Sequence, residues 1–364
     1  MFPYWLLFFI FAFGALVDAL RRSRSPALAS PAPSVGQPVR GYDPFLTSAA
    51  LVAALMIGFR YQVGGDWNPY EFIFEQIGRL SFWKAVWYMD PGYAFLNWAA
   101  NSLGIEIWSV NLVCGLLFTF GLTRFARTQP YPWLVYVVAI PYLVIGVGMG
   151  YSRQAVAIGL SLAGLAAISR GSFGRFLLWI VAAALFHRTV LIFIPIIGIS
   201  YSRNRLQTLS LTIAAVVLAY LLLQESAEGF KRAYVTRVYE SQGAGIRLAM
   251  NIVPAILFLA WSRRFEVGLA ERTTWRNLSI VALLSFAVWM VVETTVAVDR
   301  LALYIIPLQL FVFSRLPIVF SRNGTPATGV LLMVILYSAL VQFVWLFYAN
   351  HSKFWIPYQL YPVF

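Results

Sequence analysis

Long apolar runs recur along the whole chain, with short polar segments between them. A helix needs about 20 residues to cross a bilayer, so the pattern predicts an all-α polytopic membrane protein with about 11–12 transmembrane or half-membrane helices. We expect the first run to be a retained span, because it lacks a basic region and a small-residue cleavage site. The twelve apolar runs cover residues 2–20, 44–59, 106–123, 131–148, 155–169, 176–187, 189–200, 206–223, 247–262, 278–292, 300–314 and 327–348.

The polar segments between the runs differ in character, and we expect all of them to belong to one domain over residues 1–364. Residues 21–43 are rich in Ser, Pro and Ala and predict a flexible cytoplasmic loop. Residues 60–105 and 224–247 predict loops at the outer face. Within the first of them, residues 90–105 form an amphipathic segment that we expect to lie at the outer interface, anchored by Tyr93 and Trp98.

Only 11% of the residues are charged, and the net charge is +13. Sixteen of the 27 basic residues lie in alternate short loops, which is the pattern of cytoplasmic loops in membrane proteins and argues against a nucleic-acid partner. The two termini are then external. The single cysteine excludes a disulfide framework and a cysteine metal cluster.

The orientation depends on residues 176–200, where His187 and Arg188 interrupt an apolar stretch. As one helix, the stretch crosses the bilayer once and inverts every later loop. As two short helices, it forms a hairpin with His187 near the outer face. The arginines on both flanks favour the hairpin. A titratable residue at membrane depth is costly, so it usually faces a wet cavity or a partner.

In the hairpin topology, four polar groups converge on a polar cavity that faces outward, and each also has a structural interpretation. The Gly64–Gly65 pair permits a turn with positive φ before Asp66, which otherwise only caps a helix. Arg153 begins the fifth span, where the helix dipole already favours an anion; alternatively it anchors to a lipid headgroup. The residues of the four groups are Arg60 and Asp66; Tyr151, Arg153 and Gln154; His187 and Arg188; and Glu293, Asp299, Arg300 and Tyr304.

The same residues also allow purely structural interpretations. Arg60 could extend to the interface, and His187 could fix the helix break through a backbone carbonyl. Arg300 and Tyr304 share a helical face if this segment is helical, but Glu293, Asp299 and Arg300 could form only an ion network.

Three arginines near one cavity suit a pyrophosphate, because arginine binds phosphate oxygens with a two-pronged fork. We expect Arg153, Arg300 and either Arg60 or Arg188 to hold it. Burial and neighbouring arginines lower the pKa of a histidine, so His187 is a candidate general base, as is Asp66. The expected reaction is glycosyl transfer from a lipid diphosphate, without a nucleotide, metal or other cofactor, since no motif for these is present.

Five motifs, RYQVGGDWNPY, DPGYAFL, GYSRQAVAIGLSLAGLAA, ALFHRTVLI and VDRLALY, follow one another between about residues 60 and 305. In order and spacing they resemble the EpsG family, Wzy-like polymerases of bacterial exopolysaccharide. The resemblance implies polymerisation of undecaprenyl-diphosphate-linked repeat units at the outer face of the bacterial inner membrane. It also implies a flippase and a chain-length regulator as partners. The family's polar positions fall on Arg60, Asp66, Arg153, His187 and Arg300; a small or neutral residue is more usual where Arg188 stands.

Two other functions fit an intramembrane histidine or an arginine-lined cavity. One is a membrane O-acyltransferase acting on exopolysaccharide, which needs an acyl donor that usually arrives from the cytoplasmic side. The other is a non-catalytic flippase for lipid-linked sugars, which needs no base.

Overall fold

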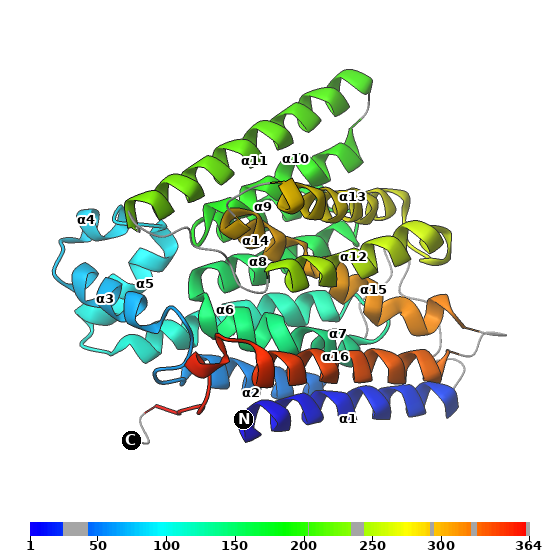
Figure 1. Cartoon of the computed structure of the whole chain (residues 1–364), viewed down its shortest axis with the longest axis horizontal. Helices are drawn as coiled ribbons and strands as arrows, with labels where there is room; N and C mark the ends of the chain where they lie inside the picture. Colours follow the sequence, from blue (N-terminus) through cyan, green and yellow to red (C-terminus); the bar gives the residue numbers. More distant parts are fainter. Residues whose placement is uncertain (25–42, 203, 234–243, 292–294, 322–325, 362–364) are drawn as a thin grey trace.

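The computed structural model describes residues 1–24, 43–202, 204–233, 244–291, 295–321 and 326–361. These residues form helices and no strand, as the apolar pattern predicts, and the long helices run roughly side by side (Figure 1). The α-helices are α1 Phe2–Arg24, α2 Pro44–Gly58, α3 Trp67–Gly78, α4 Phe82–Val86, α5 Pro91–Ser102, α6 Ile107–Ala126, α7 Pro132–Ala139, α8 Ser152–Ile168, α9 Phe173–Ala184, α10 Phe193–Gly198, α11 Arg205–Ala233, α12 Ala244–Trp261, α13 Leu269–Val291, α14 Thr295–Ala302, α15 Ile306–Val319 and α16 Thr328–Tyr348.

Apolar helices account for every predicted run. Within the described residues, six are long and apolar enough to cross a membrane, and six more are shorter. One of the short ones continues from α7 as a π-helix, Ile140–Gly148, which contains Pro141. A proline lacks the N–H that a regular helix needs, and such widened turns accommodate it. The largest boundary errors are at α11, which extends to Ala233 instead of residue 223, and at α13, which begins at Leu269 instead of residue 278. Residues 224–233 are therefore helical and not part of a loop over 224–247, because the helix continues past its apolar run.

The chain reverses at His187, so residues 176–200 form the hairpin and not a single span. Helix α9 ends at Ala184, and a 3-10 helix begins at Arg188. The ring of Phe173, at the start of α9, lies 4.7 Å from that of Tyr201, at the end of the returning arm. Since the two ends of the segment meet, the arms are antiparallel.

This reversal puts the polar loops at one end of the bundle and the arginine-rich loops at the other. Helices α3, α4 and α5 lie beyond the first end, where α1 begins (Figure 1). The turn at His187 belongs to that end, because the N–H of Gly92, in α5, donates to the carbonyl of Leu185 at 2.7 Å. We call this end the polar end and the opposite one the basic end.

The anchor predicted for residues 90–105 is wrong. Tyr93 is completely buried and packs on Tyr70, with ring centroids 5.5 Å apart, because α5 turns this face toward the bundle. Trp98 packs on Phe82 at 4.9 Å. Exposed aromatic residues at this end include Trp83 and Trp87, at 72% and 75% exposure, on and just after α4, and Phe95 of α5 at 46%.

A buried arginine joins three helix ends at the polar end. Arg60 is 2% exposed, and its guanidinium donates to the carbonyls of Ile57 at 2.6 Å and Val63 at 3.2 Å. It also donates to Asn111 Oδ1 at 3.0 Å and to Ser152 Oγ at 2.8 Å. The ends of α2, α6 and α8 are therefore held together by one side chain.

The turn after Arg60 depends on glycine, as predicted. Gly64 has φ +112°, and its N–H donates to the carbonyl of Phe354 at 2.8 Å. A side chain at this position would collide with the carbonyl of Met149. The turn is thus packed between the start of α8 and the segment that follows α16.

We expect Arg60→Met to reduce the free energy of unfolding by about 3 kcal/mol or more, because it leaves several buried acceptors without a donor. Thermal unfolding of the purified protein in detergent measures the effect. Arg79→Met is the matched control, since Arg79 is exposed after α3. Equal melting temperatures for the two variants would contradict a structural role for Arg60.

Candidate functional site

Five predicted residues gather at the polar end: Asp66, Arg153, His187, Arg300 and Tyr304. They come from the turn before α3, the first turn of α8, the reversal after α9, and α14 with the 3-10 helix Leu303–Ile305 that follows it. The positive charges of Arg153 and Arg300 act on both Asp66 and His187. Segments far apart in sequence therefore share one electrostatic site.

Arg153 is held by an aspartate that the sequence analysis did not assign. Its Nη1 lies 2.7 Å from Asp90 Oδ2, and its guanidinium also interacts with the hydroxyl of Tyr70. Asp90 precedes α5 but makes no capping bond there, so its carboxylate is available to Arg153. The motif DPGYAFL contained this residue, but nothing in its spacing connects it to residue 153.

His187 faces Tyr304. Its Nδ1 lies 3.2 Å from the Tyr304 hydroxyl, and the donor depends on the histidine tautomer. Arg153, Arg300 and Arg188 all act on the ring, so the third arginine near the site is Arg188. His187 lies in the turn between helices, where burial and these charges lower its pKa, and the imidazole is neutral.

Asp66 occupies the capping position of α3, but its side chain makes no capping bond. Its carboxylate forms no hydrogen bond or ion pair with any residue that the structure describes. Burial raises the pKa of Asp66, although the charges of Arg300 and Arg153 oppose the rise. The geometry therefore does not support the interpretation that Asp66 only caps α3.

A second ion pair, between Arg247 and Asp299, borders the site. Arg247 Nε and Nη2 lie 2.7 Å from Asp299 Oδ1 and Oδ2, respectively, which links the start of α12 to α14. The partner of Asp299 thus comes from another helix, and nothing in the sequence singled out Arg247, the last residue of the predicted loop 224–247.

Tyr151 and Gln154 connect α8 to the same region. The charges of Asp66 and Arg300 act on the Tyr151 hydroxyl, whose pKa burial raises to about 12. Gln154 Nε2 donates to the carbonyl of Arg300 at 2.9 Å. This bond gives Gln154 a positioning role, because it fixes the backbone that carries Arg300.

Arg60 does not share this site, contrary to the substrate-binding role predicted for it. All three of its nitrogens donate to protein acceptors, since the turn around Gly64 folds its side chain inward. Glu293 lies outside the described residues.

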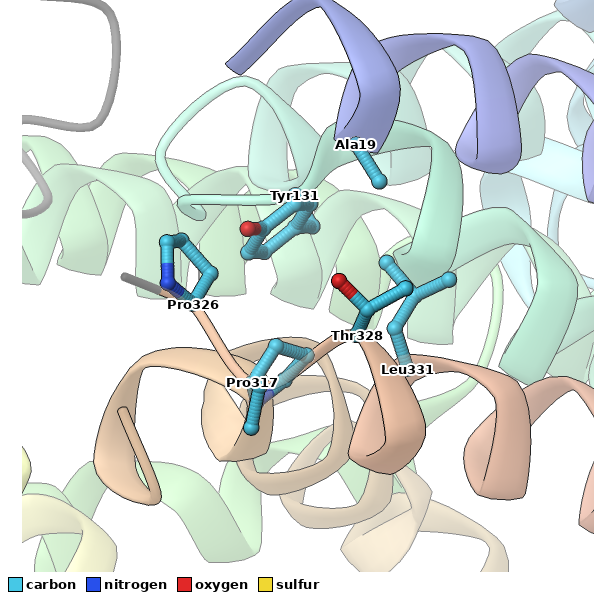
Figure 2. Close-up of a pocket in the computed structure, with 7 residues that line it drawn as sticks. Ala19, Tyr131, Pro317, Pro326, Thr328 and Leu331 are labelled. Carbon is cyan, nitrogen blue, oxygen red and sulfur yellow. The ribbon is translucent and has the colours of Figure 1, made fainter. Parts of the chain in front are cut away.

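The pocket in Figure 2 lies at the other end of the bundle. It is lined by the end of α1, the start of α7 and the junction of α15 with α16, including Tyr131 and Thr328. Its volume of about 10 Å³ is about the least that holds one water molecule. It is therefore unrelated to the chemistry at the polar end. No group of three potential metal ligands of the His, Cys, Asp or Glu type occurs in the described ranges.

Comparisons with known proteins agree with the resemblance seen in the motifs. The model of the EpsG family matches residues 44–360, which is most of the chain. No curated protein and no solved structure matches it. The family is one of exopolysaccharide polymerase-like proteins, which act on lipid-linked oligosaccharides in a membrane. The chain belongs to the EpsG family and is a multi-pass membrane protein of polysaccharide polymerisation.

Proposed function

We propose that the protein joins undecaprenyl-diphosphate-linked oligosaccharide repeat units, as a glycosyltransferase that requires no metal. The observation that carries this proposal is the gathering of Arg153 and Arg300 around Asp66 and His187 at one end of a membrane bundle. A lipid diphosphate reaches such a site from the bilayer, and its sugar extends into water.

The arginines hold the diphosphate of the donor. The paired N–H donors of each guanidinium match phosphate oxygens, and the positive charge stabilises the diphosphate as it leaves. Asp90 holds Arg153 in place before the donor binds, so little reorganisation is needed. Arg188 lies at the same turn as His187 and adds to the positive field.

The acceptor hydroxyl attacks the anomeric carbon of the donor sugar. A C–O bond forms to the acceptor, the C–O bond to the diphosphate breaks, and the lipid diphosphate leaves with the bonding electron pair. The hydroxyl proton passes to a base. We assign this role to Asp66, because burial raises its pKa toward the working pH, whereas burial and three arginines lower that of His187. His187, held by Tyr304, orients a substrate hydroxyl.

The polar end then faces the periplasm of a bacterial inner membrane. Arginine-rich loops mark the cytoplasmic side of membrane proteins, and they lie at the opposite end from the site. A flippase that delivers the lipid-linked unit and a regulator of chain length are the expected partners.

Incubation of the purified protein with lipid-diphosphate repeat units tests the function. We expect a ladder of longer glycans and release of the lipid diphosphate. Translocation of the lipid without lengthening would indicate a flippase, and transfer of an acyl group without lengthening would indicate an acyltransferase. Either result would contradict the proposal.

Arg153→Lys and Arg300→Lys should each reduce the rate of polymer formation by about 100-fold or more, because lysine lacks the fork and the stabilised charge forms mainly in the transition state. The glycan ladder measures the rate, and the melting temperature controls for folding. Arg79→Lys, an exposed change at the same end, should leave the rate unchanged. Wild-type rates in both site variants would refute the diphosphate clamp.

The pH dependence separates the two candidate bases. Asp66 must be ionised to accept a proton, and its pKa is raised, so activity should fall as the pH decreases through a value above that of an ordinary aspartate. Asp66→Asn should reduce the rate of polymer formation by about 100-fold or more at every pH. His187→Asn should keep the acidic limb of the pH profile, that is, the fall in activity at low pH. Glu75→Gln, on the exposed side of α3, is the control. A profile that loses its acidic limb in His187→Asn would instead make His187 the base.

Cysteine labelling tests the orientation after the buried Cys114 is replaced by alanine. Arg188→Cys and Arg263→Cys both introduce a thiol at an exposed position, one at each end of the bundle. In spheroplasts, a membrane-impermeant maleimide should label the first and not the second. Labelling of only the second would invert the proposed orientation.

A further inference from the structure

Three arginines converge at the basic end, where α6 ends, α8 ends and α9 begins. Arg124 lies in the last turn of α6, Arg170 follows α8, and Arg175 lies in the first turn of α9. The charges of Arg124 and Arg175 both act on Arg170 and, together with burial, lower its pKa. Like charges are thus held close together.

No acidic group offsets this repulsion within the described part of the chain. None of the three arginines takes part in an ion pair there, and no acid contributes to the field at Arg170. The Nε atoms of Arg124 and Arg170 are buried without a hydrogen-bond partner. At the polar end, by contrast, Arg153 and Arg247 each have an aspartate. The basic cluster therefore lacks the counter-charge that Arg153 and Arg247 have.

An apolar stripe leads away from the cluster along the outer surface of the bundle. On α6, Leu116, Phe120 and Arg124 follow one another at intervals of four and share one helix face; Leu116 and Phe120 are 40% and 47% exposed. On α9, Arg175 and Trp179 have the same spacing.

The side chains from α6 and those from α9 meet on the surface above α8, which is itself almost entirely buried between these two helices. The ring centroids of Phe120 and Trp179 are 5.8 Å apart, and the Arg124 guanidinium lies 5.5 Å from the Trp179 ring. A cluster of cationic side chains with an apolar stripe beside it matches a phospholipid, which has an anionic headgroup and apolar chains.

The start of α9 adds donors at the same place. Ser172 precedes the helix but makes no capping bond, so it leaves the first N–H groups without a side-chain cap. Space beside Gly174 is open. A helix start favours an anion, and Arg175 strengthens that field.

We propose that Arg124, Arg170 and Arg175 bind the phosphate of an anionic membrane lipid, with an acyl chain lying along Phe120 and Trp179. The phosphate supplies the missing counter-charge, and the apolar stripe selects a lipid over a free anion. This site is independent of the polymerase reaction, because it lies at the opposite end of the bundle.

The test compares lipids and variants by thermal unfolding in a neutral detergent. Phosphatidylglycerol should raise the melting temperature of the wild-type protein, because a ligand of the folded state stabilises it. Phosphatidylcholine, glycerol 3-phosphate and inorganic phosphate should not. In Arg170→Gln/Arg175→Gln, the apparent affinity for phosphatidylglycerol should fall roughly tenfold for each arginine lost.

The control is Arg263→Gln/Arg264→Gln, which removes two exposed positive charges from the same end, between α12 and α13. It should respond to phosphatidylglycerol as the wild type does. An equal loss of response in both double variants would mean non-specific attraction and overturn the proposal. Stabilisation of the wild type by inorganic phosphate as strongly as by the lipid would also overturn it. If the first double variant does not fold, Arg124→Gln provides the same comparison.

Discussion

The buried guanidinium of Arg60 determines where the first turn of α8 lies, and the site depends on that turn. A buried cation is costly unless its donors are bonded, and every nitrogen of Arg60 donates to a protein oxygen. One of those oxygens belongs to Ser152, directly before Arg153. The side chain that was expected to bind substrate therefore acts on the site indirectly, by fixing the helix that carries Arg153.

The reversal at His187 is the second constraint. Two arms of about a dozen residues cannot each cross a bilayer, but a hairpin buries its vertex among other helices. Its backbone is held by Gly92 of α5 and its histidine by Tyr304. Because α5 also carries Asp90 next to Arg153, the same short helix supports both the histidine and the arginine.

The arginines at the two ends of the bundle differ in whether an acidic side chain pairs with them. At the polar end, aspartates hold Arg153 and Arg247 in defined positions before any ligand arrives, and such preorganisation is what makes charge effective in catalysis. At the basic end, Arg124, Arg170 and Arg175 repel one another without such partners within the described residues. A stable arrangement there calls for an external anion, and the bilayer provides one.

The sequence alone determined the membrane class and the apolar helices, favoured the reversal near His187, and singled out most of the polar residues that gather at the polar end. Hydrophobic runs and the distribution of arginines are properties of neighbouring residues, so they are readable along the chain. Only the tertiary structure decided which polar residues touch. Asp90 and Arg247 went unassigned, Arg60 was placed in the site, and Tyr93 was placed at the interface, because each depends on a contact between segments far apart in sequence. A side chain's partner follows from how helices pack, and periodicity within one helix does not contain that information.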